Sequence, residues 1–156
     1  KSETSEPKEK IDLTKLMEDL QSEFSSTISY SHAVIECNFS SIREVTAIRS
    51  FLHNILYNLL SNSLDYRHKD RAPVIKVSTE RIHEGVMIRF EDNGIGIDLA
   101  KHGSKIFALN KRFQNTADGK GLGLFIAKAQ VDALDGSIKV DSTPGVGTIF
   151  KVTLPA

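Results

Sequence analysis

Two glycine-rich turns carry the residue types and the spacing that could do chemistry in this chain. The first, "EDNGIGID", covers residues 91–98, and the second, "DGKGLGL", covers residues 118–124. Six of the ten glycines lie between Gly94 and Gly123. Because glycine weakens helices and strands, such a cluster indicates that the backbone approaches a ligand closely at these turns.

The first turn follows a predicted strand, so Asp92 lies at a strand end. Gly94 and Gly96 let the backbone turn and approach a flat ligand. A carboxylate in this place accepts a hydrogen bond from an exocyclic amine. For "DNG" alone, an ordinary turn capped by its own side chain is the simpler interpretation.

The second turn leads into a predicted helix. Backbone N–H groups at such a helix start, exposed by glycine, form an anion site suited to phosphates, and Lys120 adds positive charge. The Walker A pattern is absent, and no strand feeds directly into this turn as a dinucleotide fingerprint requires. A flexible loop that enters a helix explains this turn equally well.

A basic stretch with two phenylalanines, Phe107 and Phe113, lies between the turns at residues 101–120. Its lysine and arginine residues are Lys101, Lys105, Lys111, Arg112 and Lys120. One interpretation is a solvated loop. The other is a mobile lid over a polyanion, with the phenylalanines docking when the lid closes.

The predicted helix at residues 50–67 carries two separate stripes. Its apolar stripe spans roughly 140° of arc and contains Leu52, Ile55, Leu56, Leu59 and Leu60. Asn54, Asn58 and Asn62 lie at about 200°, 240° and 280°, on a polar stripe with Asp65. Asparagine is unfavourable inside a helix, so this stripe is either a solvated face or a row of amide oxygens that line a site. Amide oxygens can complete the shell of a Mg²⁺ ion that phosphates already neutralise.

Apolar periodicity and turn residues predict an α+β fold. We expect helices at residues 11–28, 50–67 and 122–136, and strands at residues 33–39, 73–82, 86–92, 137–142 and 147–155. Helices and hairpins in this order predict two layers, a mixed, mostly antiparallel sheet with helices on one face. Residues 1–10 are charged and are interpreted as a linker or a tag remnant, which leaves residues 11–156 as the domain.

Composition narrows the class of protein and its compartment. The chain has 156 residues, enough for one domain, and its 20 basic and 20 acidic residues balance. The chain therefore has no excess of positive charge of the kind that binds nucleic acid or an anionic membrane surface. The single cysteine, Cys37, lies in an apolar run, so we expect a buried thiol and a reducing, cytoplasmic compartment. No apolar run reaches membrane-spanning length, and no signal peptide opens the sequence.

Taken in order, five stretches resemble the ATP-binding catalytic domain of sensor histidine kinases, and the likeness covers about residues 11–155. They are "NLLSNSLDYR" (N box), "DNGIGID" (first glycine box), "KIFALNKRF" (F box), "GKGLGLFIAK" (second glycine box) and the closing hairpin "STPGVGTIFKVTLP". Each motif alone is weak to moderate, whereas the ordered set is specific. The resemblance implies the Bergerat ATP-binding fold, a two-layer α/β sandwich, and is greatest to PAS-linked bacterial kinases.

The resemblance also implies roles for individual residues. Asn62 would coordinate Mg²⁺, Asn58 would support the phosphates, and Asp92 would accept from the adenine amino group. The other nucleotide-binding residues would be Tyr66, Gly94, Gly96 and Thr148 around the base, and Arg112, Lys120, Gly121, Leu122 and Gly123 at the phosphates. Asn62, Arg112 and Lys120 would form the catalytic set. Asp65 departs from the family, which usually has lysine there, and its carboxylate would repel the nucleotide.

In this family the phosphoryl group passes from ATP to a histidine on a partner helix. His83 precedes Glu84 inside a predicted hairpin turn, and His53 lies near the apolar stripe, so neither has the expected setting of an acceptor. We therefore expect the acceptor histidine to lie in a dimerisation domain of the parent protein, with a response regulator as indirect partner. The isolated chain is expected to be a monomer that binds ATP, makes no direct membrane contact and does not phosphorylate itself.

Two alternatives stay open at this point. The first is a degenerate, non-catalytic nucleotide-binding module in which Asp65 has removed function. The second is another ATPase of the same superfamily, such as a chaperone or topoisomerase fragment. This second alternative is disfavoured because the sequence closes with "VTLP" after the last hairpin and leaves no room for a transducer domain.

Overall fold

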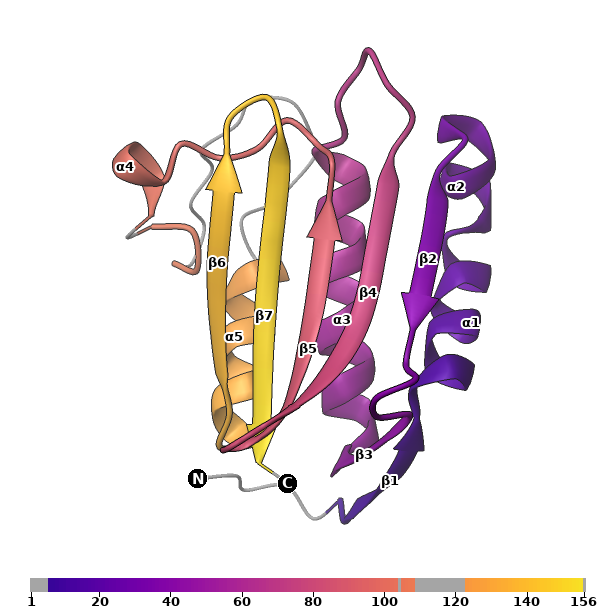
Figure 1. Cartoon of the computed structure of the whole chain (residues 1–156), viewed down its shortest axis with the longest axis vertical. Coiled ribbons are helices and arrows are strands. Elements are labelled where there is room, and N and C mark those ends of the chain that lie inside the picture. Colours follow the sequence, from indigo (N-terminus) through magenta and orange to yellow (C-terminus); the bar gives the residue numbers. More distant parts are fainter. Residues whose placement is uncertain (1–5, 104, 109–122, 156) are drawn as a thin grey trace.

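The computed structural model of the chain describes residues 6–103, 105–108 and 123–155. Figure 1 shows two layers, a twisted sheet and a layer of helices packed on one of its faces. The elements are β1 (Lys8–Asp12), α1 (Leu13–Glu23), α2 (Ser25–Ser31), β2 (Val34–Asn38), β3 (Glu44–Ile48), α3 (Arg49–Asp65), β4 (Val74–Ile82), β5 (Gly85–Asp92), α4 (Leu99–His102), α5 (Gly123–Ala133), β6 (Ser137–Thr143) and β7 (Gly147–Pro155). The predicted α+β class is confirmed.

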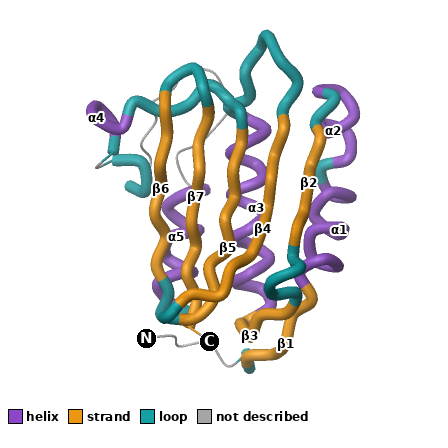
Figure 2. The backbone as a smooth tube through the Cα atoms, viewed as in Figure 1, coloured by secondary structure: helices purple, strands orange, loops and turns teal. Residues whose placement is uncertain are grey.

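The main sheet has five strands in the order β2-β4-β5-β7-β6 (Figure 2). β2 pairs with β4 in parallel, and every other neighbouring pair in this sheet is antiparallel. A separate two-stranded sheet joins β1 to β3. The expected mixed, mostly antiparallel sheet is therefore present, and both predicted hairpins, β4–β5 and β6–β7, form.

The core lies between the sheet and the helices because strand and helix periodicities both present apolar side chains there. Val77, Phe90 and Phe150 are neighbours across β4, β5 and β7, and all three are buried. The whole predicted apolar stripe of α3 is buried against them. Each fully buried large apolar side chain contributes about 1.5–3 kcal/mol relative to exposure, so this shared core sets the spacing between α3 and the strands.

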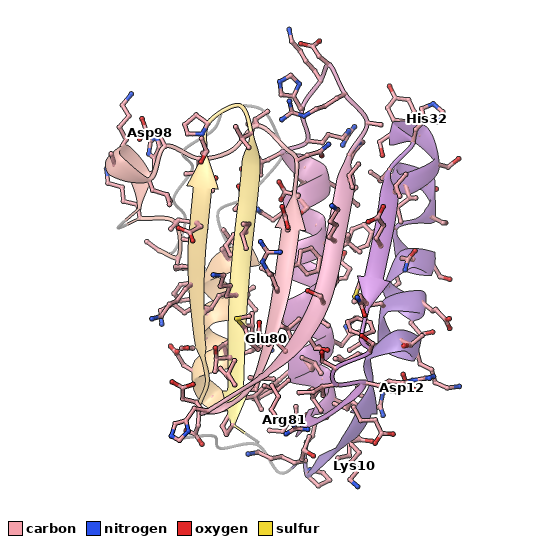
Figure 3. All side chains as sticks on the ribbon, in the orientation of Figure 1. Lys10, Asp12, His32, Glu80, Arg81 and Asp98 are labelled. Atoms are coloured by element: carbon pink, nitrogen blue, oxygen red, sulfur yellow. The ribbon has the colours of Figure 1, made fainter. Side chains whose placement is uncertain are left out.

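The first predicted helix is interrupted. α1 ends at Glu23, Phe24 is its C-cap, and α2 begins at Ser25. Asp12 caps the start of α1, where its Oδ1 atom accepts from the backbone N–H groups of Thr14 and Lys15. Figure 3 shows Asp12 and Lys10 at the end of the molecule opposite Asp98.

Two further features differ from the expectations drawn from sequence. The strand β1 begins at Lys8, within the stretch interpreted as a linker, because its backbone pairs with β3 from Lys8 to Asp12. Cys37 is exposed, so the prediction of a buried thiol is wrong. Its strand, β2, lies at the sheet edge and has a neighbour on one side only. No helix within the described residues is both long and apolar enough to cross a membrane.

We predict that the buried hydroxyl of Thr79 stabilises the fold by holding the β2–β3 connection. It donates to the carbonyl of Ile42 at 2.6 Å and accepts from the N–H of Ile42 at 3.2 Å. Thr79→Val keeps the shape but leaves both groups of Ile42 without this partner, which lowers the free energy of unfolding by about 1–3 kcal/mol. Thr79→Ser keeps the hydroxyl and costs only about 0.8 kcal/mol for the lost methyl group. Denaturant unfolding of both variants measures this, and equal stability of Thr79→Val and the wild type would contradict it.

Candidate functional site

The candidate site lies at the end of the sheet where α3 ends, β5 ends and the β6–β7 turn closes (Figure 1). Asp92 is the last residue of β5, and its neighbours across the sheet are Ile75 of β4 and Thr148 of β7. Side chains alternate along a strand, so Asp92 points to the same face as the buried Phe90, toward α3.

Three hydrogen bonds fix the carboxyl group of Asp92. Its Oδ1 atom accepts from the backbone N–H of Gly94 at 2.9 Å and from that of Thr148 at 3.3 Å. Its Oδ2 atom accepts from the hydroxyl of Ser63 at 2.8 Å. Burial raises the pKa of Asp92 above its ordinary value, because the loss of water disfavours the charged form more than these three donors favour it.

The glycines of the first turn let separate parts of the chain meet. A side chain at Gly94 would place its Cβ atom 2.6 Å from the carbonyl oxygen of Tyr66. That same oxygen accepts from the N–H of Ile95 at 3.0 Å, so the turn is bonded to the end of α3. Gly96 has a φ of +76°, and a Cβ atom there would lie 2.1 Å from the carbonyl oxygen of Thr143. In the structure, Gly94 thus lies against the end of α3, and Gly96 lies against the β6–β7 hairpin.

Ser142 connects the first turn to β7. Its hydroxyl accepts from the N–H of Ile97 and donates to the carbonyl of Gly147, both at 2.8 Å. It also lies 2.8 Å from the hydroxyl of Thr148, which is buried. The predicted site residues Asp92, Gly94 and Thr148 are therefore joined in one hydrogen-bonded cluster, and the backbone of Tyr66 is bonded to the same turn. The fourth predicted residue of this group, Gly96, lies in that turn against Thr143.

The amide stripe of α3 runs toward this cluster. Asn54 is exposed, whereas Asn58 and Asn62 are half-buried. The Nδ2 atom of Asn58 donates to the carbonyl of Asn54 at 2.8 Å. Its Oδ1 atom faces the start of α5, because a Cβ atom at Gly123 would lie 3.2 Å from it. The two helices thus meet at a neutral amide and a glycine.

Asn62 lies one turn closer to Asp92 than Asn58 does. Within the part of the chain that the structure describes, no residue hydrogen-bonds the side-chain amide of Asn62, and no cluster of three or more His, Cys, Asp or Glu residues could hold a metal. A single neutral amide oxygen fits Mg²⁺ that takes its other ligands from phosphates and water. It does not fit a metal held by a protein cage.

The last residue of α3 is Asp65, the residue at which the sequence departs from the family pattern. Asp65 is exposed and, with Arg67, His68 and Ile95, lines a cavity of about 1180 Å³. Arg67 donates to the carbonyl of Leu64 at 2.7 Å, which places a cation at the negative end of the helix. Arg112, Lys120, Gly121 and Leu122 lie outside the described residues.

Sequence reasoning missed three residues of the cluster. Ser63 lies at about 20° on the helical wheel, in the middle of the apolar stripe, and a polar residue there indicates a buried partner. Asn93 accepts from the N–H of Val74 at 2.9 Å and donates to the carbonyl of Ala72 at 3.1 Å, which ties the turn to the start of β4. Ser142 had no signal in the sequence, because its partners are distant along the chain.

The chain matches known proteins in sequence. The sequence profile of the family "Histidine kinase-, DNA gyrase B-, and HSP90-like ATPase" matches residues 47–156. The histidine protein kinase SaeS of Staphylococcus aureus is 31% identical over 153 residues, which cover 95% of this chain and 43% of SaeS. The non-motile and phage-resistance protein of Caulobacter vibrioides is 31% identical over 126 residues, 78% of this chain and 15% of that protein. The chain therefore spans less than half the length of these relatives.

Solved structures share the fold. The catalytic domain of histidine kinase ThkA superposes with a TM-score of 0.80 at 21% identity, covering 95% of both chains. The mycobacterial sensor histidine kinase MprB gives 0.80 at 23% identity, covering 95% of this chain and 97% of that one. Full-length ShkA gives 0.82 at 22% identity, covering 99% of this chain and 33% of ShkA. The profile match and the 31% identity to SaeS show that this chain belongs to the histidine kinase-, DNA gyrase B- and HSP90-like ATPase family, as a domain whose relatives are histidine kinases.

Proposed function

We propose that this chain is the catalytic domain of a two-component sensor histidine kinase that binds Mg-ATP and donates the γ-phosphoryl group. The observation that carries the proposal is Asp92, a half-buried carboxyl held by Ser63, Gly94 and Thr148 beside the amide-bearing helix α3. The sequence profile supports ATP binding, and the relatives support kinase chemistry.

Asp92 is the proposed acceptor for the adenine amino group. A carboxylate offers about four acceptor positions, and three are taken by the donors already described. The position that is left can accept one N–H from the base. Tyr66, Gly94, Gly96 and Thr148 are the proposed neighbours of the ring.

The phosphates are proposed to lie along α3 toward the start of α5. Asn58 and Gly123 meet there, and Asn62, one turn further along α3, is proposed to supply a neutral amide oxygen for Mg²⁺. Bound Mg²⁺ would neutralise charge on the phosphate oxygens. Lys120 and Arg112, with the backbone of Gly121 and Leu122, are proposed to contact the phosphates, although these four residues lie outside the described part of the chain.

In the proposed transfer, a histidine ring nitrogen forms a bond to the γ-phosphorus, the bond from that phosphorus to the bridging oxygen breaks, and ADP leaves. The protein contributes position and charge rather than a covalent step. The acceptor histidine is proposed to lie on the dimerisation domain of the same parent protein, with a response regulator taking the phosphoryl group next. A cytoplasmic location and a monomeric isolated chain belong to this proposal.

Asp65 favours one alternative, a nucleotide-binding module with weak or no kinase activity. Its carboxylate is exposed on the last turn of α3, beside the cavity at that helix end. Negative charge near the phosphates opposes binding unless a cation compensates.

We predict that ADP with Mg²⁺ stabilises the wild-type chain and fails to stabilise Asp92→Asn. Ligand at 100 times its Kd adds about 2.7 kcal/mol to the free energy of unfolding. The asparagine amide oxygen can still accept from Gly94 and Thr148, but the amide nitrogen cannot accept from the base. Thermal unfolding with and without ligand measures this, with the exposed Asp141→Asn on the outer sheet face as control. A wild type that shows no shift at millimolar nucleotide would argue against the proposed function.

The same variant tests the electrostatics of the site without ligand. Because burial raises the pKa of Asp92 in the folded state, the wild type is most stable, relative to Asp92→Asn, below the ordinary carboxyl pKa of about 3.8. It loses stability as the pH rises through the folded pKa, since the buried group must then carry charge. We expect Asp92→Asn to unfold at a higher temperature than the wild type at pH 7, with this advantage disappearing near pH 3.

We predict that Asn62→Ala loses the Mg²⁺-dependent part of nucleotide affinity. Titration calorimetry with ADP, in Mg²⁺ and in a chelator, gives the two Kd values. In the variant they should become equal, while the Kd in chelator stays within about threefold of the wild type, because one neutral amide contributes little to binding without the ion. Asn54→Ala, exposed on the same stripe, is the matched control. An unchanged effect of Mg²⁺ in Asn62→Ala would refute the metal assignment.

We predict that Asp65→Lys tightens ATP binding, on the order of fivefold at physiological salt, because it replaces repulsion of the phosphates by attraction. Asp70→Lys, which changes the charge equally on the α3–β4 connection, should have a smaller effect because salt screens the longer distance. Weaker binding in Asp65→Lys, or equal effects in both variants, would contradict the repulsion. Direct titration with ATP distinguishes these outcomes.

A further inference from the structure

Arg71 bonds to two turns that are about 50 residues apart in the sequence. It lies in the connection between α3 and β4, and its side chain is exposed. Its Nε atom donates to the carbonyl oxygen of Asn93 at 2.8 Å, and its Nη2 atom donates to the carbonyl oxygen of Gly94 at 3.1 Å. The same Nη2 atom lies 2.8 Å from the carbonyl of Gly145 and 3.2 Å from that of Val146. One guanidinium group therefore spans the first glycine turn and the β6–β7 turn.

These two turns carry the groups proposed to hold the base. Asp92 lies in the first glycine turn, directly before Asn93, and Thr148 lies two residues after Val146 of the β6–β7 turn. The N–H of Thr148 donates to Asp92 at 3.3 Å, the longest of the three hydrogen bonds to that carboxyl. This length lies just beyond the usual range of about 2.7–3.2 Å for an N–H···O hydrogen bond, so a small further separation of the two turns would break the bond.

The chemistry of Arg71 suits a bridge between two backbone segments. Guanidinium is planar, always charged and presents five N–H donors in a fixed fork. Its charge-assisted hydrogen bonds are stronger than neutral ones. Lysine carries a similar charge on a single nitrogen and cannot reproduce the fork. Arg49 provides a comparison, because it is also an exposed arginine. It pairs with Glu9 at the other end of α3, far from the two turns, and its contact can affect stability only.

We infer that Arg71 is a positioning residue for base recognition. It fixes the distance between the Asp92 turn and the β6–β7 turn, and through them the direction in which the Asp92 carboxyl faces the base. It acts on the base and not on the phosphates, because all four carbonyls that it contacts belong to the two turns that flank Asp92 and Thr148. This inference rests on the proposed function, which supplies adenine as the ligand.

Base selectivity provides a test that a purely structural role would not affect. ADP carries the amino group from which Asp92 is proposed to accept a hydrogen bond, whereas inosine diphosphate carries a carbonyl oxygen at that position. We expect the wild type to prefer ADP by about tenfold or more, since a hydrogen bond to a charged group is worth that much. In Arg71→Ala the Kd for ADP should rise about tenfold and the Kd for inosine diphosphate less than about threefold, so the preference falls. Arg71→Lys should lose most of the preference as well, and Arg49→Ala should keep it.

The outcomes separate this inference from the proposed function. A wild type that binds neither nucleotide, or binds both equally, removes the assignment of Asp92 and the inference with it. A wild type that prefers ADP, together with an unchanged preference in Arg71→Ala, overturns the inference alone. A proportional loss for both nucleotides would make Arg71 a general structural residue, and full preference in Arg71→Lys would make its charge, not its bridge, the cause. Each of these results also overturns the inference.

Discussion

The rest of the site depends on one constraint, a carboxyl group held in a place where burial disfavours its charge. Asp92 tolerates this because α3, the first glycine turn and β7 each supply one donor. A buried charge without such partners would be far too costly to keep. The three segments must therefore keep a fixed spacing, and the packing of α3 on β5 and β7 provides it. The contacts that hold this part of the fold together are thus the same ones that would position Asp92 for the proposed recognition of the base.

The second constraint is the junction of α3 with α5. Asn58 bonds back onto its own helix, which turns its carbonyl oxygen toward the glycine that begins α5. A larger residue at Gly123 would have to displace this amide, so the start of α5 is positioned against the polar stripe. The proposed phosphate region thus lies where the two helices meet at a neutral amide and a glycine, so that neither of these groups brings a charge that would compete with an ion bound with the nucleotide.

Much of this structure could be predicted from sequence where the determining pattern is local. The two stripes of α3 follow from a 3.6-residue period, and the hairpins follow from strand alternation around short turns. The break at Phe24 and the strand β1 could not be predicted, because "KEKID" gains its strand only through pairing with β3. The exposure of Cys37 depends on which strand lies at the edge of the sheet. In the site, the position of Asp92 was evident from its turn, whereas its partner Ser63 and the bridge made by Arg71 arise from contacts between distant segments.

The position of β7 has a consequence for how the protein is made. β7 comes last of the described strands along the chain, yet it lies inside the sheet, between β5 and β6. Until it has left the ribosome, β5 has one bare edge and Asp92 lacks the N–H of Thr148. A nascent chain that has exposed only the first 140 or so residues should therefore be unable to capture ATP, and it presents unpaired backbone to which chaperones bind. Nucleotide capture would then mark the completion of synthesis of the domain.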